Sequence, residues 1–234
     1  KFDTVKNRTI RDTGKLSSVG FSRNTKSSQQ NPSIISYKVV NMSCLTNTAA
    51  MFVGCTNLLS ENLDISQLDT SNCSSFGSMF ENCYSLSSLN LEHFNTSKCT
   101  SFAYMFYNCK NLTDLKINNF DTSNATSLGS MFGHCAELTN LNLSNFDTSN
   151  CNNFSSMFLG CKKMENLDVS NFDTSSAIYF NNMFASCDLL SAINLGNFNT
   201  NNVEGMSTMF RNSNSLKTLD LSNFNTPKNK TLHG

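Results

Sequence analysis

The chain has 234 residues, a formal net charge of zero, 15% charged residues and 38% hydrophobic residues. A surface with few and balanced charges lacks the field of one sign that attracts nucleic acid or an anionic membrane, so we expect no nucleic-acid binding. No apolar run approaches the roughly 18 residues that cross a bilayer. We therefore expect no direct membrane insertion of this region.

Residues 1–40 form a polar N-terminal segment that does not repeat. Two glycines and a proline predict loops, and the apolar residues between Ile34 and Val40 predict one strand. We interpret the segment as a cap over the first repeat, because the open end of a stacked array exposes apolar core and a sheet edge. A linker from a preceding domain is the alternative for residues 1–30.

Residues 41–226 contain seven units of a repeat marked by the dipeptide Met-Phe. The spacing is 28 residues once and 26 residues five times, with the methionines at Met51, Met79, Met105, Met131, Met157, Met183 and Met209. Such a period is typical of a solenoid, in which each unit buries its apolar face by stacking on its neighbours. The first unit has extra residues between Leu58 and Leu63, as an irregular terminal repeat would. Residues 227–234 form a C-terminal tail.

The first half of each unit follows the pattern LxxLxLxxFxT. In the fifth unit these residues are Leu138, Leu141, Leu143, Phe146 and Thr148. The LxL part alternates apolar and polar residues, which is the period of a half-buried strand. The sequence therefore predicts one short strand per unit, and the equal spacing predicts that these strands are parallel.

After the threonine, the apolar spacing changes to that of a helix of about three turns. Asp147 and Thr148 would cap its start. Gly160 would end it in the left-handed conformation, at a position that holds Gly or Asn in most units. The predicted buried face of this helix consists of Cys151, Phe154, Met157, Phe158 and Cys161.

Nine of the ten cysteines fall in two columns, and Cys44 lies outside both. The first column holds Cys55, Cys83, Cys109, Cys135, Cys161 and Cys187, with Ser213 in the last unit. The second holds Cys73, Cys99 and Cys151, with Ala125, Ala177 and Val203 in other units. Replacement by small residues favours buried free thiols. Disulfides between adjacent units are the alternative, since a spacing of about 5 Å would permit them.

The pattern LxxLxLxxFxT resembles the leucine-rich-repeat consensus. Units such as LNLSNFDTSNCNNFSSMFLGC are similar to the BspA-type leucine-rich-repeat family of bacterial surface proteins, over about residues 50–226. The resemblance implies an α/β fold, a curved leucine-rich-repeat-like solenoid with one short parallel strand and one short helix per unit. It also implies a secreted or anchored surface protein that adheres to macromolecules, and it supplies no catalytic residues.

The polar position between the two leucines of LxL is the candidate partner-binding site. Solenoids use such columns as extended binding surfaces, because each strand presents one side chain at regular spacing. A merely solvated face is the alternative for any single residue. The column consists of Asp64, Asn90, Lys116, Asn142, Asp168, Asn194 and Asp220.

Three other sets of polar residues have simpler interpretations than a ligand site. The Asp/Asn column that includes Asp147 offers one carboxylate per unit, too few for calcium, and is interpreted as helix caps or Asx-turns. The threonine column is interpreted as capping hydroxyls, with an ice-binding array as the alternative. His93, His134 and His233 share no spacing, and no acidic or histidine column accompanies the thiols, so we expect no metal site.

These patterns predict a non-enzymatic protein without a cofactor. The first hypothesis is a cell-surface adhesion or interaction module that binds a protein or glycan through the strand face. A structural or decorating subunit of a larger surface assembly, which contacts copies of itself, is the alternative. An intracellular scaffold is a third possibility, motivated by the free thiols. We expect any secretion signal or anchor to lie outside this chain.

Overall fold

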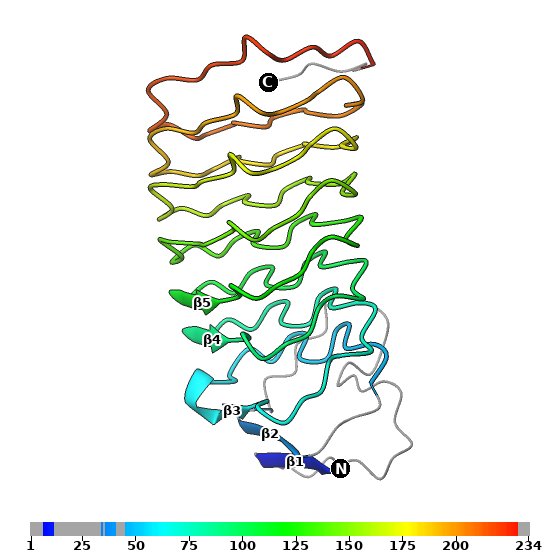
Figure 1. The fold of residues 1–234 in the computed structure, drawn as a ribbon. Helices are drawn as coiled ribbons and strands as arrows, with labels where there is room; N and C mark the ends of the chain where they lie inside the picture. The colour runs from blue at the N-terminus through cyan, green and yellow to red at the C-terminus, as the bar shows by residue number, and fades with distance from the viewer. Residues whose placement is uncertain (1–6, 12–33, 35, 41–44, 229–234) are drawn as a thin grey trace.

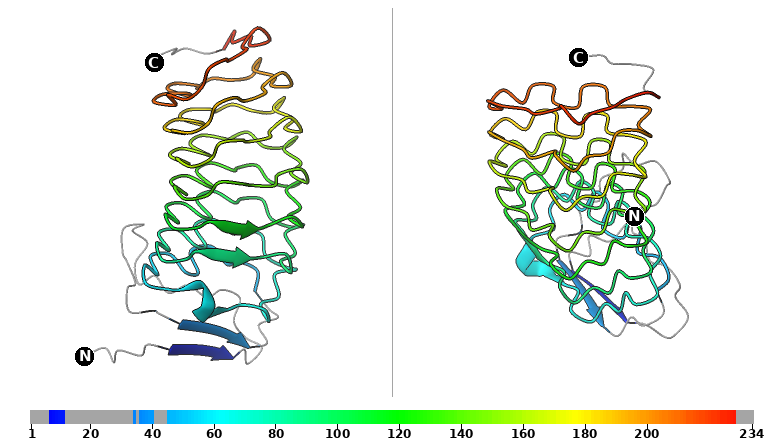
Figure 2. Two further views of the ribbon diagram at one scale, coloured as in Figure 1. Left: turned by 90° about the vertical axis from the view of Figure 1, so that its left-hand side faces the viewer. Right: turned by 45° about the horizontal axis from the view of Figure 1, so that its top comes forward.

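The computed structural model describes residues 7–11, 34, 36–40 and 45–228. The repeats stack as successive rungs along one axis (Figures 1 and 2), and this stacking confirms the predicted repetition. Two parallel sheets have the orders β1-β2-β3 and β4-β5. The assigned elements are β1 Asn7–Arg11, β2 Ser36–Val40, the 3-10 helix η1 Ser60–Asn62, β3 Leu63–Asp64, β4 Ser88–Asn90 and β5 Asp114–Lys116.

The strands β1 and β2 extend the parallel ladder in front of the first unit. Strand β2 confirms the strand predicted near residue 37, and it pairs with β3 so that Tyr37 lies opposite Leu63. Strand β1 was not predicted, and it pairs with β2 along its whole length. The short helix η1 occupies the extra residues of the irregular first unit. Most of the loops predicted in residues 1–40, and most of the C-terminal tail, lie outside the described residues.

The helix predicted in each unit is wrong. Its place is taken by a ribbon of β-turns whose N–H groups point to the next rung. The donors Phe154, Ser156, Phe158 and Gly160 bind the carbonyl oxygens of Tyr179, Asn181, Met183 and Ala185 at 2.8–3.0 Å. A helix would need the same N–H groups for carbonyls four residues earlier in the chain. Bonding between rungs therefore replaces bonding within a helix.

Two left-handed residues per rung shape this ribbon. Ser156 has φ 57° and Gly160 has φ 70°. Each is the third residue of a turn closed by an N–H···O bond of 3.1 Å, from Met157 to Phe154 and from Cys161 to Phe158. This is the position at which a type II turn requires positive φ. The left-handed position predicted after Met-Phe is thus confirmed, although it ends a turn and not a helix.

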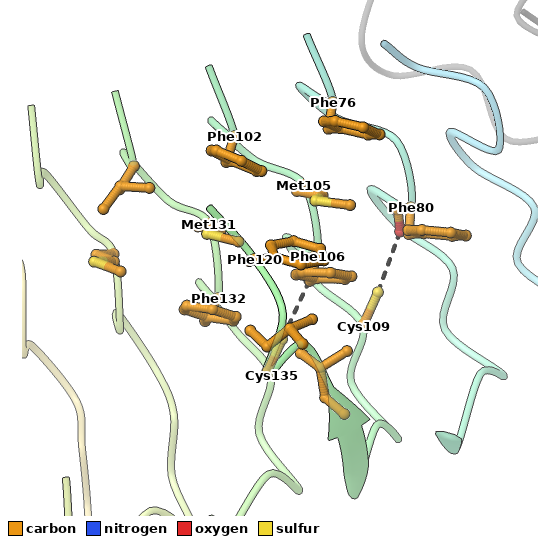
Figure 3. Packing of buried hydrophobic residues seen from close by; sticks show 14 of the residues in the cluster. Phe76, Phe80, Phe102, Met105, Phe106, Cys109, Phe120, Met131, Phe132 and Cys135 are labelled. Carbon is orange, nitrogen blue, oxygen red and sulfur yellow. Dashed lines mark hydrogen bonds between the residues drawn. The ribbon is translucent and has the colours of Figure 1, made fainter. Parts of the chain in front are cut away.

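The apolar positions predicted to face inward form one continuous core. Eight of the nine inward positions of the fifth unit are buried, and Leu141 is half-buried against the others. The phenylalanines of the Met-Phe pairs stack from Phe52 to Phe210, with ring centroids 5.3–5.9 Å apart. Figure 3 shows Phe80, Phe106 and Phe132 of this column. The spacing that suggested a helix face also describes the inner face of the turn ribbon.

The prediction of one LxL strand per unit is only partly confirmed. Assigned strands occur at β3, β4 and β5, whereas residues 140–142, 166–168, 192–194 and 218–220 form none. The continuous parallel ladder lies on the turn ribbon, along Ser75, Ser101, Ser127, Asn153, Tyr179 and Gly205. The ribbon fixes the stacking with four bonds between typical neighbouring rungs. The LxL segments are therefore free to separate on their own side.

Polar side chains add bonds between rungs. Thr174 donates through Oγ1 to the carbonyl of Asn199 at 3.1 Å and accepts its N–H at 2.7 Å. The threonines of the FxT column are 1–2% exposed, so they bridge rungs and neither cap helices nor form an ice-binding array; they are Thr70, Thr96, Thr122, Thr148, Thr174 and Thr200. Asn150 donates to the carbonyl of Ser123 in the preceding rung at 2.8 Å. The abundance of threonine and asparagine thus serves the stacking.

The nine cysteines other than Cys44 are buried free thiols, as predicted. In the first column, each thiol from Cys83 to Cys187 donates to the phenylalanine carbonyl of the preceding rung at 3.1–3.2 Å; Figure 3 marks two of these bonds. Ser213 makes the same bond to Phe184. The column therefore selects a small hydrogen-bond donor, which was not predicted from the sequence. Cys44 lies outside the described residues.

Candidate interaction surface

The LxL side of the rungs forms the strand face, defined by residues 63–66, 88–92, 114–118, 140–144, 166–170, 192–196 and 218–222. Exposed polar residues flank a row of leucines and isoleucines on this face. Leu141 and Ile193 are half-buried, while Leu115 and Leu167 are buried at the edge of the core. The face therefore offers narrow apolar strips between polar rows.

Open hollows lie between neighbouring rungs of the strand face. The largest of the three, about 510 Å³, extends from β5 over the next two rungs and is lined by Leu115, Lys116, Leu141, Asn142 and Asp168 among others. The other two have volumes of about 380 and 350 Å³. They arise where the main chains of adjacent rungs are not hydrogen-bonded. All three are open to solvent, so they suit a ligand that lies along the face.

The predicted binding column lies on this surface, one residue per rung. Six of its seven members are exposed, and Asp64 is half-buried. Consecutive members therefore line one side of the stack, and the structure brings Lys116, Asn142 and Asp168 to the same hollow.

Six members of the predicted column also hold the fold together. In each, a side-chain Oδ1 accepts the N–H of the residue two positions later, as in an Asx-turn. For Asp168 the acceptor binds Ser170 N at 2.9 Å and Ser170 Oγ at 2.6 Å. These turns end the LxL segments, which sequence reasoning missed although a Ser two residues after Asp signals them. The six residues are Asp64, Asn90, Asn142, Asp168, Asn194 and Asp220.

Lys116 is the exception in this column. Its ammonium group makes no hydrogen bond or ion pair with the described part of the chain, so it remains available to a ligand. It is also the one cation in the column.

Asp64 and Asp168 of the face are ionised at neutral pH. The pKa of Asp64 is lowered to about 2, first by Lys38, whose Nζ lies 2.8 Å from Oδ2, and then by Ser66. Hydrogen bonds from Ser170 lower the pKa of Asp168. The face thus presents fixed negative charges with Lys116 between them.

The second Asp/Asn column confirms the Asx-turn interpretation and contradicts helix capping. Asp147 Oδ1 accepts Ser149 N at 3.0 Å. Among the histidines, His93 Nε2 lies 3.0 Å from the carbonyl of Ile65, whereas His233 lies outside the described residues. Within the described ranges there is no group of three or more side chains suited to a metal ion.

The chain matches the protein family described as Mycoplasma protein of unknown function, DUF285, over residues 20–141 and 126–234. The chain belongs to this family. The family model matches twice, over two overlapping segments, as expected for a chain that consists of repeats. No curated protein and no solved structure matches the chain.

In this DUF285 family member, the described residues contain no helix of the length and apolarity that a membrane span requires. Sequence reasoning also missed that the apolar strips and the residues beside Lys116, such as Asp114 and Asn118, line the same hollow as the predicted column. The signal was present, because each of these residues occurs within two positions of an LxL residue.

Proposed function

We propose that this protein is a non-enzymatic interaction module that binds a macromolecular partner, a protein or a glycan, through the strand face. The observation that carries the proposal is the combination of apolar strips, fixed charges and open hollows on one side of successive rungs. Extended partners gain contact area with each rung, as on the binding surfaces of other repeat proteins.

The non-enzymatic part of the proposal rests on the chemistry of the available groups. Burial raises the pKa of eight of the nine described thiols, for example that of Cys135 to well above its ordinary value, so these thiols stay protonated and are poor nucleophiles. The carboxylates of the strand face that join Asx-turns already bind their own backbone. These groups support binding better than acid–base or nucleophilic chemistry.

The leucine-rich-repeat-like solenoid and the BspA-type resemblance belong to the same proposal. They are supported by the 26-residue stacking and the inward LxL leucines. One difference is that the continuous ladder lies on the turn ribbon and not on the LxL side. We place the module at the cell surface or outside the cell, on the strength of the sequence resemblance.

A charge-variant experiment tests the strand face. Lys116→Glu combined with Asp168→Asn alters the central hollow, and the asparagine keeps the Asx-turn acceptor. The matched control combines Lys162→Glu with Asp188→Asn, an exposed pair 3.9 Å apart outside the strand face. Purified matrix proteins and glycans are immobilised and each variant is titrated by surface plasmon resonance.

We expect at least one immobilised partner to bind the unaltered protein. The strand-face variant should weaken that binding by about tenfold, or roughly 1.4 kcal/mol, and the control should not. Equal affinity of all three proteins, or equal loss in the control, would refute a role for this part of the face. Circular dichroism confirms that each variant is folded.

A structural role in a surface assembly is the second candidate, favoured by an edge of the last described rung that no other described residue covers. Positions that are buried in one rung, such as Leu195 and Phe198, correspond to exposed Leu221 and half-buried Phe224 in the rung that follows it. In the last turn ribbon, the four N–H groups that would bind the next rung have no acceptor among the described residues. These N–H groups belong to Met206, Thr208, Phe210 and Asn212.

The polarity of this edge restricts what can cover it. A row of N–H donors pairs with a row of carbonyls and not with a second row of donors, so two such ends cannot pair backbone to backbone. Self-association through this edge therefore predicts a head-to-tail contact. Sedimentation velocity over a range of concentrations tests it: Leu221→Lys should reduce association, and a monomer at every concentration would exclude this candidate.

A further inference from the structure

A cluster of aromatic side chains lies on the turn ribbon and the corner after it, outside the strand face. The rings of Tyr104 and Tyr107 are 5.5 Å apart, and those of Tyr107 and His134 are 5.3 Å apart, both edge to face. Lys110 Nζ lies 4.6 Å above the ring of Tyr84. We call these five residues the aromatic patch. It joins three consecutive rungs.

Tyr104 is a bulky residue at a position where the turn ribbon requires a left-handed backbone. Its φ is 60°, and its side chain is 46% exposed. Left-handed backbone is unfavourable for a bulky residue, and such outliers concentrate at functional sites. The other units place small residues at this left-handed position, namely Ala50, Ser78, Ser130, Ser156, Asn182 and Thr208. A ring at this position gains little from burial.

Two glycines make room for the neighbouring rings. A Cβ atom on Gly133 would lie 2.9 Å from the ring of Tyr107 in the preceding rung. A Cβ atom on Gly160 would lie 2.5 Å from Nδ1 of His134 in the same way. Real Cβ atoms do not approach that closely, so each ring depends on a glycine one rung further along. The patch is thus matched across rungs and is not a chance grouping of surface tyrosines.

Polar side chains of the same rungs pack around Tyr84. Asn108 Nδ2 donates to Asn82 Oδ1 at 2.7 Å and to the hydroxyl of Tyr84 at 3.4 Å. Glu81, which is 8% exposed, accepts from Asn82 Nδ2 at 3.3 Å and keeps that amide in place. The pKa of His134 is lowered, first by burial and then by nearby lysines, so this ring is neutral at neutral pH.

We propose that the aromatic patch is a second binding site, which takes a neutral glycan, with one sugar ring stacked on Tyr104. A sugar with equatorial hydroxyls has a flat face of C–H groups that packs on an aromatic ring, and its hydroxyls bind amides and phenols at the rim. Tyr84, Asn82 and Asn108 supply such groups beside the rings. The site is independent of the strand face.

The dimensions of the patch favour a glycan over a protein partner. A stable protein interface buries about 800 Å² on each side and needs several apolar anchors. Here one ring is exposed, and the same left-handed position in the adjacent rungs carries Ser78 and Ser130. One exposed ring with a polar rim matches a single sugar residue and its neighbours.

Tyrosine fluorescence provides a direct assay, because the chain contains five tyrosines and no tryptophan. The probes are cellohexaose and the hexamer of β-1,4-linked N-acetylglucosamine, titrated into the full chain, with isothermal titration calorimetry as a second readout. The test variant is Tyr104→Ser, which places the residue of the adjacent rungs at this position. The matched control is Tyr179→Ser, which removes a similarly exposed ring three rungs away.

We expect at least one oligosaccharide to bind the unaltered protein and the Tyr179 variant equally. Tyr104→Ser should weaken that binding by about tenfold or more, with little change in melting temperature. Absence of binding by both probes, or equal binding by the Tyr104 variant, overturns the proposal. If Tyr104→Ser instead reduces binding only to an immobilised protein, the patch is a protein-binding surface and the proposal is wrong.

Discussion

The two cysteine columns should respond in opposite ways to the same substitutions. Cys135 represents the first column, in which the thiol donates to the buried carbonyl of Phe106 at 3.2 Å. Cys151 is the most weakly bonded member of the second column: its sulfur lies 3.6 Å from its nearest carbonyls, against 3.4 Å for Cys73 and 3.2 Å for Cys99, and other units have Ala or Val there. The first column holds only Cys or Ser, which can donate, whereas the second also accepts apolar side chains without a donor.

The expected free energies follow from these contacts. Cys135→Ala loses roughly 1 kcal/mol of apolar burial and leaves the carbonyl short of a bond worth roughly 1 kcal/mol, so we expect a loss of about 2 kcal/mol. Cys135→Ser keeps a donor, as Ser213 does at 2.5 Å from the carbonyl of Phe184, and should lose less. Cys151→Ala should lose about 1 kcal/mol, and Cys151→Ser about 1–3 kcal/mol because it buries a hydroxyl without a close acceptor.

Urea unfolding followed by circular dichroism in the presence of a reducing agent measures all four variants. Serine should be the milder change in the first column, and alanine the milder change in the second. If one residue is milder in both columns, hydrogen bonding does not distinguish them and the reasoning is refuted. A change in the slope of the unfolding transition would indicate altered cooperativity of the array and is checked first.

Three further predictions use the same measurement. Thr174→Val should lose about 2–3 kcal/mol because two buried bonds between rungs disappear. Thr226→Val should lose little, because Thr226 bridges to no further rung among the described residues, and equal losses would contradict the bridging role. Ser156→Gly should be stabilising at φ 57° by about 1 kcal/mol, whereas Ser155→Gly should be destabilising; a helix would make both destabilising. Glu81→Gln should stabilise the protein more at pH 7 than at pH 4. Burial raises the folded pKa of Glu81 above 4.5, so the unaltered protein loses stability as the pH rises and Glu81 ionises. A gain from the substitution that does not grow with pH would contradict this.

The period of the sequence was sufficient to predict the stacking and the buried positions. A side chain that recurs every 26 residues packs against the equivalent side chains of the neighbouring rungs. Phe106, which stacks between Phe80 and Phe132, illustrates why each column keeps one type of residue. The helix could not be distinguished in this way. The spacing of Phe154, Met157 and Phe158 fits both a helix and a turn ribbon, and the two differ only in whether an N–H group binds four residues away or one rung away.

The Asx-turns changed the interpretation of the predicted site. Asp168 was selected because it alternates with buried leucines, and it is indeed exposed. Its Oδ1 is nevertheless bound to Ser170, so the regular recurrence of Asp and Asn in that column reflects local backbone chemistry. Lys116 breaks the column and has no such bond. In a repeat protein, a residue shared by most units therefore indicates the fold, and a residue that departs from its column is the better candidate for function.

The same reasoning applies to the aromatic patch. Tyr104 and His134 occupy left-handed positions where other units have mostly small residues or residues that adopt positive φ easily, so both depart from their columns. Tyr107 lies three residues after Tyr104 and one rung before His134, which the 26-residue period could have indicated in advance. What the sequence could not supply is the side to which each ring turns. That direction depends on Gly133 and Gly160, each one rung further along. It brings the unusual residues of neighbouring rungs together on one surface.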